Sequence, residues 1–134
     1  MTEKELSGLY WLNMETKLLQ KELDELEYSI SVKSVVLSHS PKAKNKRRFG
    51  VEDLAVEIAD LKAIIQLNLQ KIQIERARLE RYIENINDPE TRLIFRLRHI
   101  NCMTWQDIGS ELYMSHMTVI RKHRAYLKVV QNVQ

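Results

Sequence analysis

Residues 104–124 read TWQDIGSELYMSHMTVIRKHR, and this stretch decides how the C-terminal part of the chain folds. Thr104 is a residue type that is common at helix N-caps, and Asp107 follows it three positions later, close to the capping-box pattern. Ser115 is a second N-cap residue, eleven positions after Thr104. Apolar residues flank each cap in the staple positions, namely Met103 and Ile108, then Met114 and Val119. Two short helices joined by a tight turn are therefore predicted, which is the layout of a helix-turn-helix.

The two helices must cross closely, and Gly109 stands where a small residue is needed. Glycine inside a helix costs up to ~1 kcal/mol relative to alanine, so tight packing is the expected compensation. Trp105 is expected to cover the edge of the core rather than stack on bases. The predicted small core consists of Ile108, Leu112, Met114, Val119, Tyr126 and Leu127.

The second helix, Ser115 to about Lys128, is basic and would enter the major groove of DNA. Arg121 is the best candidate for a guanine, because its guanidinium matches the O6 and N7 acceptors in a bidentate pair. Met117 and Ile120 would meet thymine methyl groups. The other predicted DNA-binding residues are Ser115, His116, Thr118, Arg124, Lys128, Arg96 and Arg98, with Lys122 as a further phosphate contact.

The helix before this motif starts at Asp88-Pro89-Glu90. Asp88 suits the N-cap, Pro89 the first turn and Glu90 the positive end of the helix dipole. The apolar pattern predicts that Leu93, Ile94, Leu97 and Ile100 are buried, while Arg92, Arg96, Arg98 and His99 lie on the other faces.

Two longer amphipathic helices are predicted before residue 88. In the first, at residues 1–37, one heptad row contains Leu12, Leu19 and Leu26, and its companion row contains Thr16, Leu23 and Ile30. In the second, at residues 51–87, one row contains Val51, Ile58, Ile65, Ile72, Leu79 and Ile86, and the partner row contains Leu54, Leu61, Asn68, Glu75 and Tyr82.

The partner row turns polar at Asn68 and Glu75, which leaves two interpretations. Either polar residues lie inside the seam and fix its register or partner, or the seam changes face and uses Leu69 and the stem of Arg76. The helices would fold back as an antiparallel hairpin, and a seam of this length favours a homo-oligomer, most simply a dimer.

Residues 38–50 between them, with Pro41 and Gly50, predict a basic loop. Its cations are either simply solvated or contact phosphates; they are Lys42, Lys44, Lys46, Arg47 and Arg48.

The bulk properties favour an all-α protein and exclude several other classes. Three Gly and two Pro are too few for a strand-rich fold of 134 residues. The net charge is +3, and residues 89–134 hold seven Lys and Arg against three Asp and Glu. Cys102 is the only cysteine, so no intrachain disulfide forms. No long apolar run or secretion signal is present, so we expect a cytoplasmic protein without a membrane partner.

The residues do not support an enzyme. The four histidines are not spaced with Cys or carboxylates as metal ligands, and neither a phosphate-binding glycine loop nor a nucleophile motif occurs. We therefore expect no catalytic residue, metal or cofactor.

The segment from Glu90 to Lys128 resembles region 4 of sigma factors, through RLRHI at 96–100, TWQDIG at 104–109, Met114-Ser115, Thr118-Val119 and RAYL at 124–127. With the preceding helices and basic loop, the chain is similar to the RinA/ArpU-type transcriptional regulators of phages and prophages. That resemblance implies an all-α fold and promoter binding by the C-terminal domain at 88–134. It also implies activation of late phage genes, such as packaging and lysis operons, in a bacterial host cell.

The chain departs from the family pattern at the turn, where Tyr113 stands in place of a frequent glycine and would need an unusual backbone. His116 and Lys122 also replace a frequent arginine and a frequent apolar residue, which affects base preference rather than the fold. Two other functions stay open. One is a DNA-packaging protein like the small terminase subunit, and the other is a helical adaptor that binds RNA polymerase or another protein. A ring of many subunits would favour the former over a dimeric activator.

Overall fold

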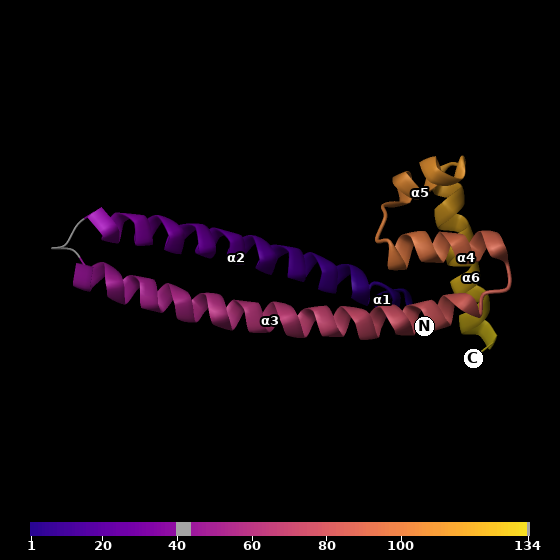
Figure 1. Ribbon diagram of the computed structural model, residues 1–134. Helices are drawn as coiled ribbons and strands as arrows, with labels where there is room; N and C mark the ends of the chain where they lie inside the picture. Colours follow the sequence, from indigo (N-terminus) through magenta and orange to yellow (C-terminus); the bar gives the residue numbers. More distant parts are fainter. Residues whose placement is uncertain (40–43, 134) are drawn as a thin grey trace. The chain divides into compact units, whose positions relative to one another are not determined.

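The computed structural model describes residues 1–39 and 44–133, and the side chains of 1–33 and 50–132. Over these ranges the chain is helical and contains no strand, which confirms the all-α prediction (Figure 1). The helices are α1 (Glu3–Leu6), α2 (Gly8–His39), α3 (Lys44–Glu84), α4 (Pro89–Phe95), the π-helix η2 (Arg96–Ile100), α5 (Trp105–Leu112) and α6 (His116–Val133). None of the described helices combines the length and apolar character that a membrane crossing requires.

The chain divides into two compact units. One unit is Met14–Gln70, which holds most of α2 and the first part of α3. The other unit joins Met1–Asn13 to Lys71–Gln134, so it combines the N-terminal segment, the end of α3 and the helices that follow. The predicted DNA-binding domain began at residue 88. The structure adds residues from both earlier helices to the same compact unit.

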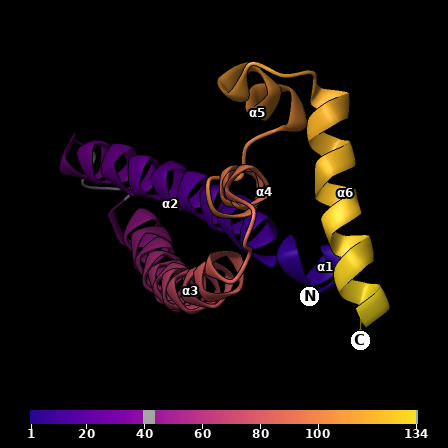
Figure 2. The same cartoon turned by 90° about the vertical axis from the view of Figure 1, so that its right-hand side faces the viewer.

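Within Met14–Gln70, α2 and α3 lie side by side as an antiparallel hairpin (Figures 1 and 2). The predicted heptad rows form the protected faces: Leu23 and Ile65 are buried, and their row neighbours on each helix are half-buried. Lys62 reaches across to Glu27 in an ion pair of 3.4 Å between Nζ and Oε1. Burial of these apolar rows is the main source of hairpin stability, because exposed ion pairs contribute little.

Asn68 lies inside the seam, with only 5% of its surface exposed. Leu69 is 43% exposed and Arg76 is exposed as well, so the seam does not change face. Of the two interpretations of this row, the one that keeps polar residues in the seam is therefore confirmed. The amide nitrogen Nδ2 of Asn68 has no hydrogen-bond partner among the described residues, which costs stability.

The connection between the long helices is shorter than the loop predicted for residues 38–50. Helix α2 continues to His39 and α3 begins at Lys44, because an amphipathic helix can extend through a polar segment without loss of its seam. Lys42 lies outside the described residues, and so do the side chains of Lys44, Lys46, Arg47 and Arg48. Contact of these cations with phosphates therefore stays a prediction.

The unit formed by Met1–Asn13 and Lys71–Gln134 is built around one larger core. Its buried members come from the N-terminal segment, from α3, and from the helices that follow: Leu6, Leu9, Leu79, Ile83, Ile86, Phe95, Ile100 and Leu127. Leu127 of α6 thus packs on this core rather than on the small helix-turn-helix core in which it was predicted. The N-terminal segment is a structural part of the unit that contains the helix-turn-helix.

A capping box stabilises the start of α1. The backbone N–H of Glu5 donates to Oγ1 of Thr2, and the backbone N–H of Thr2 donates to Oε2 of Glu5, at 3.2 and 3.1 Å. This reciprocal pair satisfies two N–H groups that a helix start would otherwise leave open. Leu6, at the end of α1, is fully buried and fastens the turn to the core. We call residues 1–7 the N-terminal arm.

Candidate nucleic-acid interface

The first helix of the motif, α5, begins as predicted. Thr104 is its N-cap, and Oγ1 accepts a hydrogen bond of 3.1 Å from the backbone N–H of Asp107. Ile108 and Gly109 are buried on its inner side. The small core contains Ile94, Ile108 and Val119 and is bordered by half-buried apolar side chains: Leu97, Met103, Trp105, Leu112 and Met114. Trp105 covers the edge of this core, in agreement with its predicted role.

The turn between α5 and α6 depends on two backbone features. A Cβ atom at Gly109 would lie 2.7 Å from the carbonyl oxygen of Met114, closer than real Cβ atoms approach, so a glycine is needed there. Tyr113 adopts the left-handed conformation, with φ 57° and ψ 41°, and its side chain is 97% exposed. The unusual backbone predicted at this non-glycine position is therefore present.

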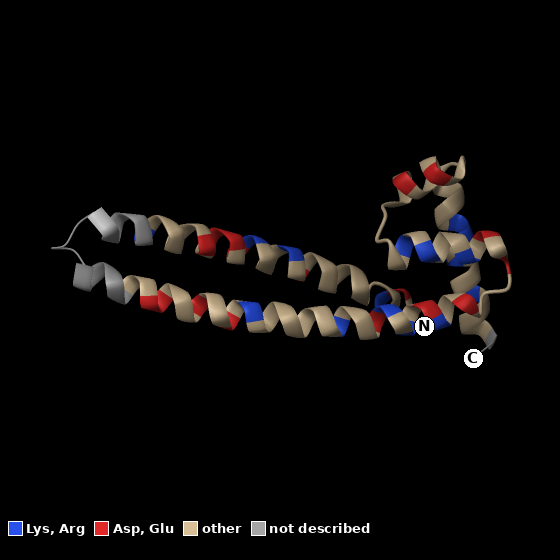
Figure 3. Cartoon of the chain, in the orientation of Figure 1, with Lys and Arg blue, Asp and Glu red and all other residues tan. Residues whose placement is uncertain are grey.

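The second helix, α6, begins after Ser115, whose Oγ accepts a hydrogen bond of 3.2 Å from the backbone N–H of Met117. Val119 and Leu127 lie on its buried face, while Met117 is 56% exposed. The helix from His116 to Val133 contains four Lys and Arg and no acidic residue (Figure 3). Among the described helices, α6 is the longest one without an acidic residue.

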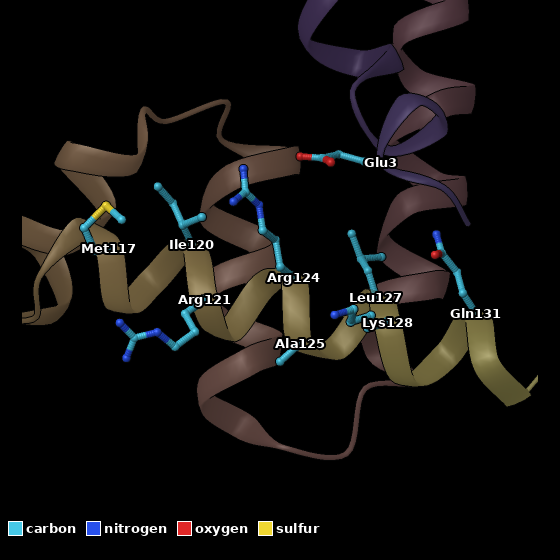
Figure 4. Close-up of a pocket in the computed structure, with 9 residues that line it drawn as sticks. All are labelled: Glu3, Met117, Ile120, Arg121, Arg124, Ala125, Leu127, Lys128 and Gln131. Atoms are coloured by element: carbon cyan, nitrogen blue, oxygen red, sulfur yellow. The ribbon is translucent and has the colours of Figure 1, made fainter.

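The structure brings most of the predicted DNA-binding residues of α6 to one surface. His116, Met117, Arg121, Arg124 and Lys128 are exposed, and Thr118 and Ile120 are half-buried. A groove of about 600 Å³ runs along this helix (Figure 4), and its lining residues are Met117, Ile120, Arg121, Arg124, Ala125, Leu127, Lys128 and Gln131, with Glu3 from the arm. Among the described residues, the side chains of Arg121, Arg124 and Lys128 take part in no hydrogen bond or ion pair.

Three other predicted phosphate contacts have partners inside the protein. Lys122 forms an ion pair with Glu90, and Nη1 of Arg96 lies 3.8 Å from Oε1 of Glu80. Arg98 donates from Nη1 to the carbonyl of Met103 at 2.9 Å, and its guanidinium carbon lies 4.3 Å from the centroid of the Trp105 ring. The Arg98 side chain therefore joins η2 to the start of α5, a role that the sequence pattern did not indicate.

Helix α4 starts with the predicted N-cap. Oδ2 of Asp88 accepts from the backbone N–H of Thr91 at 3.0 Å and from its hydroxyl at 2.6 Å. These hydrogen bonds favour the carboxylate form and hold the pKa of Asp88 below its ordinary value. The buried face of α4 consists of Thr91, Ile94 and Phe95. Leu93 lies outside that face and is 43% exposed, so the prediction that it is buried was wrong.

The helix then continues as the π-helix η2, in which the backbone N–H of Asn101 donates to the carbonyl of Arg96 at 3.1 Å. A turn that is one residue wider than an α-turn carries the buried face from Ile94 and Phe95 to His99 and Ile100. His99, predicted on an outer face, is only 5% exposed. His99 follows the buried Phe95 by four residues, and the prediction missed its burial because it did not place Phe95 on the buried face.

A pair of buried histidines joins η2 to the inner side of α6. Nε2 of His99 lies 2.8 Å from Nε2 of His123, which is fully buried. The imidazole of His123 stacks on Phe95 with ring centroids 4.5 Å apart and meets Trp105 edge-on at 4.9 Å. His123 follows Val119 by four residues and precedes Leu127 by four, and this spacing was the available sequence signal for its burial.

The two imidazoles share one hydrogen bond, in which one Nε2 atom donates and the other accepts. Nδ1 of His123 is buried and has no hydrogen-bond partner among the described residues. The histidine pair therefore joins η2 to α6 inside the unit.

Burial also explains why the pKa values of both histidines are low. Desolvation lowers the pKa of His99 to about 3, and the positive charges of His123 and Arg98 act in the same direction. Desolvation lowers the pKa of His123 to about 4, with further contributions from Arg98 and Arg124. Both rings are consequently neutral near pH 7.

The comparisons with known proteins place the chain in a family without assigning its function. No curated protein and no solved structure gave a significant match. The model of a protein family of unknown function, DUF1492, matches residues 32–131, which is most of the chain and includes the helix-turn-helix. The chain therefore belongs to the protein family of unknown function DUF1492.

Proposed function

We propose that the protein is a sequence-specific DNA-binding transcriptional regulator that inserts α6 into the major groove. The observation that carries this proposal is the exposed face of α6, where Arg121, Arg124 and Lys128 have no partner among the described residues. Helix α6 follows a tight turn and packs on a small core, as the second helix of a helix-turn-helix does. An acid-free helix of this kind suits the negative potential of a duplex.

The positions along α6 suggest distinct roles. Arg121 would donate two hydrogen bonds to the O6 and N7 atoms of a guanine, and Met117 and Ile120 would contact thymine methyl groups. Arg124 and Lys128, nearer the C-terminal end of α6, would contact phosphates. Ser115, His116 and Thr118 stand at the N-terminal end of the helix, which enters the groove first.

The cations with intramolecular partners support this surface indirectly. The ion pair of Lys122 with Glu90 joins α6 to α4, and Arg98 holds the start of α5 through Met103 and Trp105. We therefore assign Arg98 and Lys122 to positioning of the motif. Arg96 stays a weaker candidate for a phosphate contact, because its ion pair with Glu80 is long and exposed.

We also propose that the protein acts as a homo-oligomer, most simply a dimer on two half-sites. The Met14–Gln70 unit exposes several large apolar side chains outside its own seam, namely Met14, Leu18, Tyr28, Val32, Val56, Ile64, Leu67 and Leu69. Exposed apolar groups on long helices suit association between copies. The resemblance to phage and prophage regulators is what suggests activation of late phage genes as the biological role, with RNA polymerase as a further partner.

Selection of binding sites from a random duplex pool with the full-length protein tests the proposal. We expect a defined motif, and two half-sites would report a dimer and its spacing. Binding without any sequence preference by a ring of many subunits would instead indicate a DNA-packaging role. No binding at all would contradict the proposal and leave the motif as a protein-interaction module.

The Arg121→Ala variant tests the assigned base contact. It should lose about 1–3 kcal/mol of affinity for the selected site while binding to unrelated DNA stays nearly unchanged. Arg81→Ala is the matched control, because Arg81 is an exposed arginine of α3 that does not line the groove. An equal loss on every sequence would show that Arg121 contacts a phosphate.

A further inference from the structure

The groove along α6 contains one acidic side chain, and it comes from the other end of the chain. Glu3 of the arm lines the groove with Arg121, Arg124 and Lys128. Figure 4 shows Glu3 across the groove from Arg124, whereas the side chain of Arg121 points away from Glu3. A carboxylate is thus placed beside the cations that we assign to DNA binding.

The position of Glu3 is held by the folded unit. The capping box of Thr2 and Glu5 closes the turn around it, and the side chain of Leu6 is fully buried. Leu6 shares its core with Phe95 of α4 and Ile100 of η2, so the same turn belongs to the packed interior of the unit. Glu3 therefore lies on a turn that is closed by its capping box and anchored by Leu6.

The charge of Glu3 is not neutralised by a neighbour. The side chain is exposed, and within the described ranges it takes part in no ion pair or hydrogen bond. A DNA backbone that contacts Arg124 and Lys128 would enter the groove that this carboxylate also lines. Charges interact over the screening length of physiological salt, which is about 8 Å. Like charges within that length repel each other, so the Glu3 carboxylate disfavours the approach of the DNA phosphates.

We propose that Glu3 is an anti-phosphate residue, which lowers the affinity of the α6 groove for the DNA backbone whatever the base sequence. The inference rests on the proposed function, because it requires that DNA occupy this groove. Its consequence is that the base contacts of α6 must supply a larger share of the binding free energy. The arm thereby regulates binding through its charge as well as completing the fold.

The test compares Glu3→Gln with the full-length protein on two duplexes, the selected site and an unrelated sequence. Neutralising the carboxylate should raise affinity by about two- to fivefold on both duplexes at moderate salt. Glu84→Gln is the matched control, because Glu84 is an exposed acid of the same unit that does not line the groove, and it should have no such effect. Glu3→Asp keeps the charge and should bind like the unmodified protein.

The salt dependence gives an independent readout. Glu3→Lys should steepen the slope of log affinity against log salt by about one unit, since it adds one cation that can displace a counterion. Equal affinities of the Glu3→Gln and Glu84→Gln variants would overturn the inference, and so would a gain confined to certain sequences, which would mean that Glu3 contacts a base. If the unmodified protein binds neither duplex, the proposed function itself fails.

Discussion

Stability of the helix-turn-helix unit should fall steeply as the pH drops below about 6.5, because of the two buried histidines. An unfolded histidine has a pKa near 6.5, whereas the folded values are about 3 for His99 and about 4 for His123. The folded state therefore favours the neutral rings, and unfolding at pH 5 takes up nearly two protons. The stabilisation is fully present above the unfolded pKa and is lost as the pH falls toward the folded values.

The magnitude follows from these values. Each histidine contributes a slope of up to about 1.4 kcal/mol per pH unit in this window, so the pair should reduce the free energy of unfolding by about 4 kcal/mol between pH 7 and pH 5. That loss is a large fraction of the 5–15 kcal/mol that is typical of a folded domain. Most carboxylates remain ionised above pH 5, so they contribute little to this slope.

Urea unfolding at pH 7, 6 and 5, followed by tryptophan fluorescence, measures the effect. Trp11 and Trp105 both belong to the unit that contains the two histidines, so their emission reports that unit. Replacement of both rings by phenylalanine should flatten the pH dependence, whereas His116→Gln, which alters an exposed histidine of α6, should leave it unchanged. The reasoning would be refuted if the NMR signals of His99 and His123 titrated near pH 6.5.

Three substitutions test other features of the fold by chemical denaturation. Gly109→Ala should destabilise the protein by about 1–3 kcal/mol, because its Cβ would meet the carbonyl of Met114. The neighbouring Ser110→Ala should be nearly neutral. Equal stabilities of these two variants would contradict the close crossing of α5 and α6. Asn68→Leu should stabilise the hairpin by about 1–3 kcal/mol by removing a buried amide without a partner, and a loss of stability would show that the amide is bonded. Asp88→Ala should lower the free energy of unfolding because α4 loses its N-cap, and Asp88→Asn should lower it less because the amide oxygen can still accept. Equal stabilities of the Asp88→Ala variant and the unmodified protein would show that this cap does not stabilise α4.

The local features of the chain could be predicted because they depend on neighbours in the sequence. The caps at Asp88 and Thr104 are short-range hydrogen bonds between residues three positions apart. The heptad rows of α2 and α3 follow from the 3.6-residue period, and they form the protected faces of the hairpin. Gly109 was identified for the same reason, since a close helix crossing requires a small residue at a definite position, whereas Tyr113 was identified because it departs from the pattern of the family that the chain resembles.

The wrong predictions concern the helix around His99 and the polar segment between the two long helices. His99 was expected on an outer face because Phe95, which precedes it by four residues, was not recognised as part of the buried face. The basic segment after Pro41 lacks an apolar face, so it was assigned to a loop, although α3 begins at Lys44. The intramolecular partners of Arg98 and Lys122 were not indicated by the sequence, and contact of these two cations with phosphates stays a prediction.

The sequence by itself determined the all-α class, the seams of the long helices and the helix-turn-helix with its basic second helix. These properties are set by side-chain periodicity, caps and composition, which act over a few residues. Only the tertiary structure decided that the N-terminal arm belongs to the same unit as α6, that His99 pairs with His123, and that Glu3 lines the groove. Such contacts join residues that are far apart in the chain, and they form because burial of Leu6, Leu79 and Leu127 in one core outweighs the entropy of closing the intervening chain.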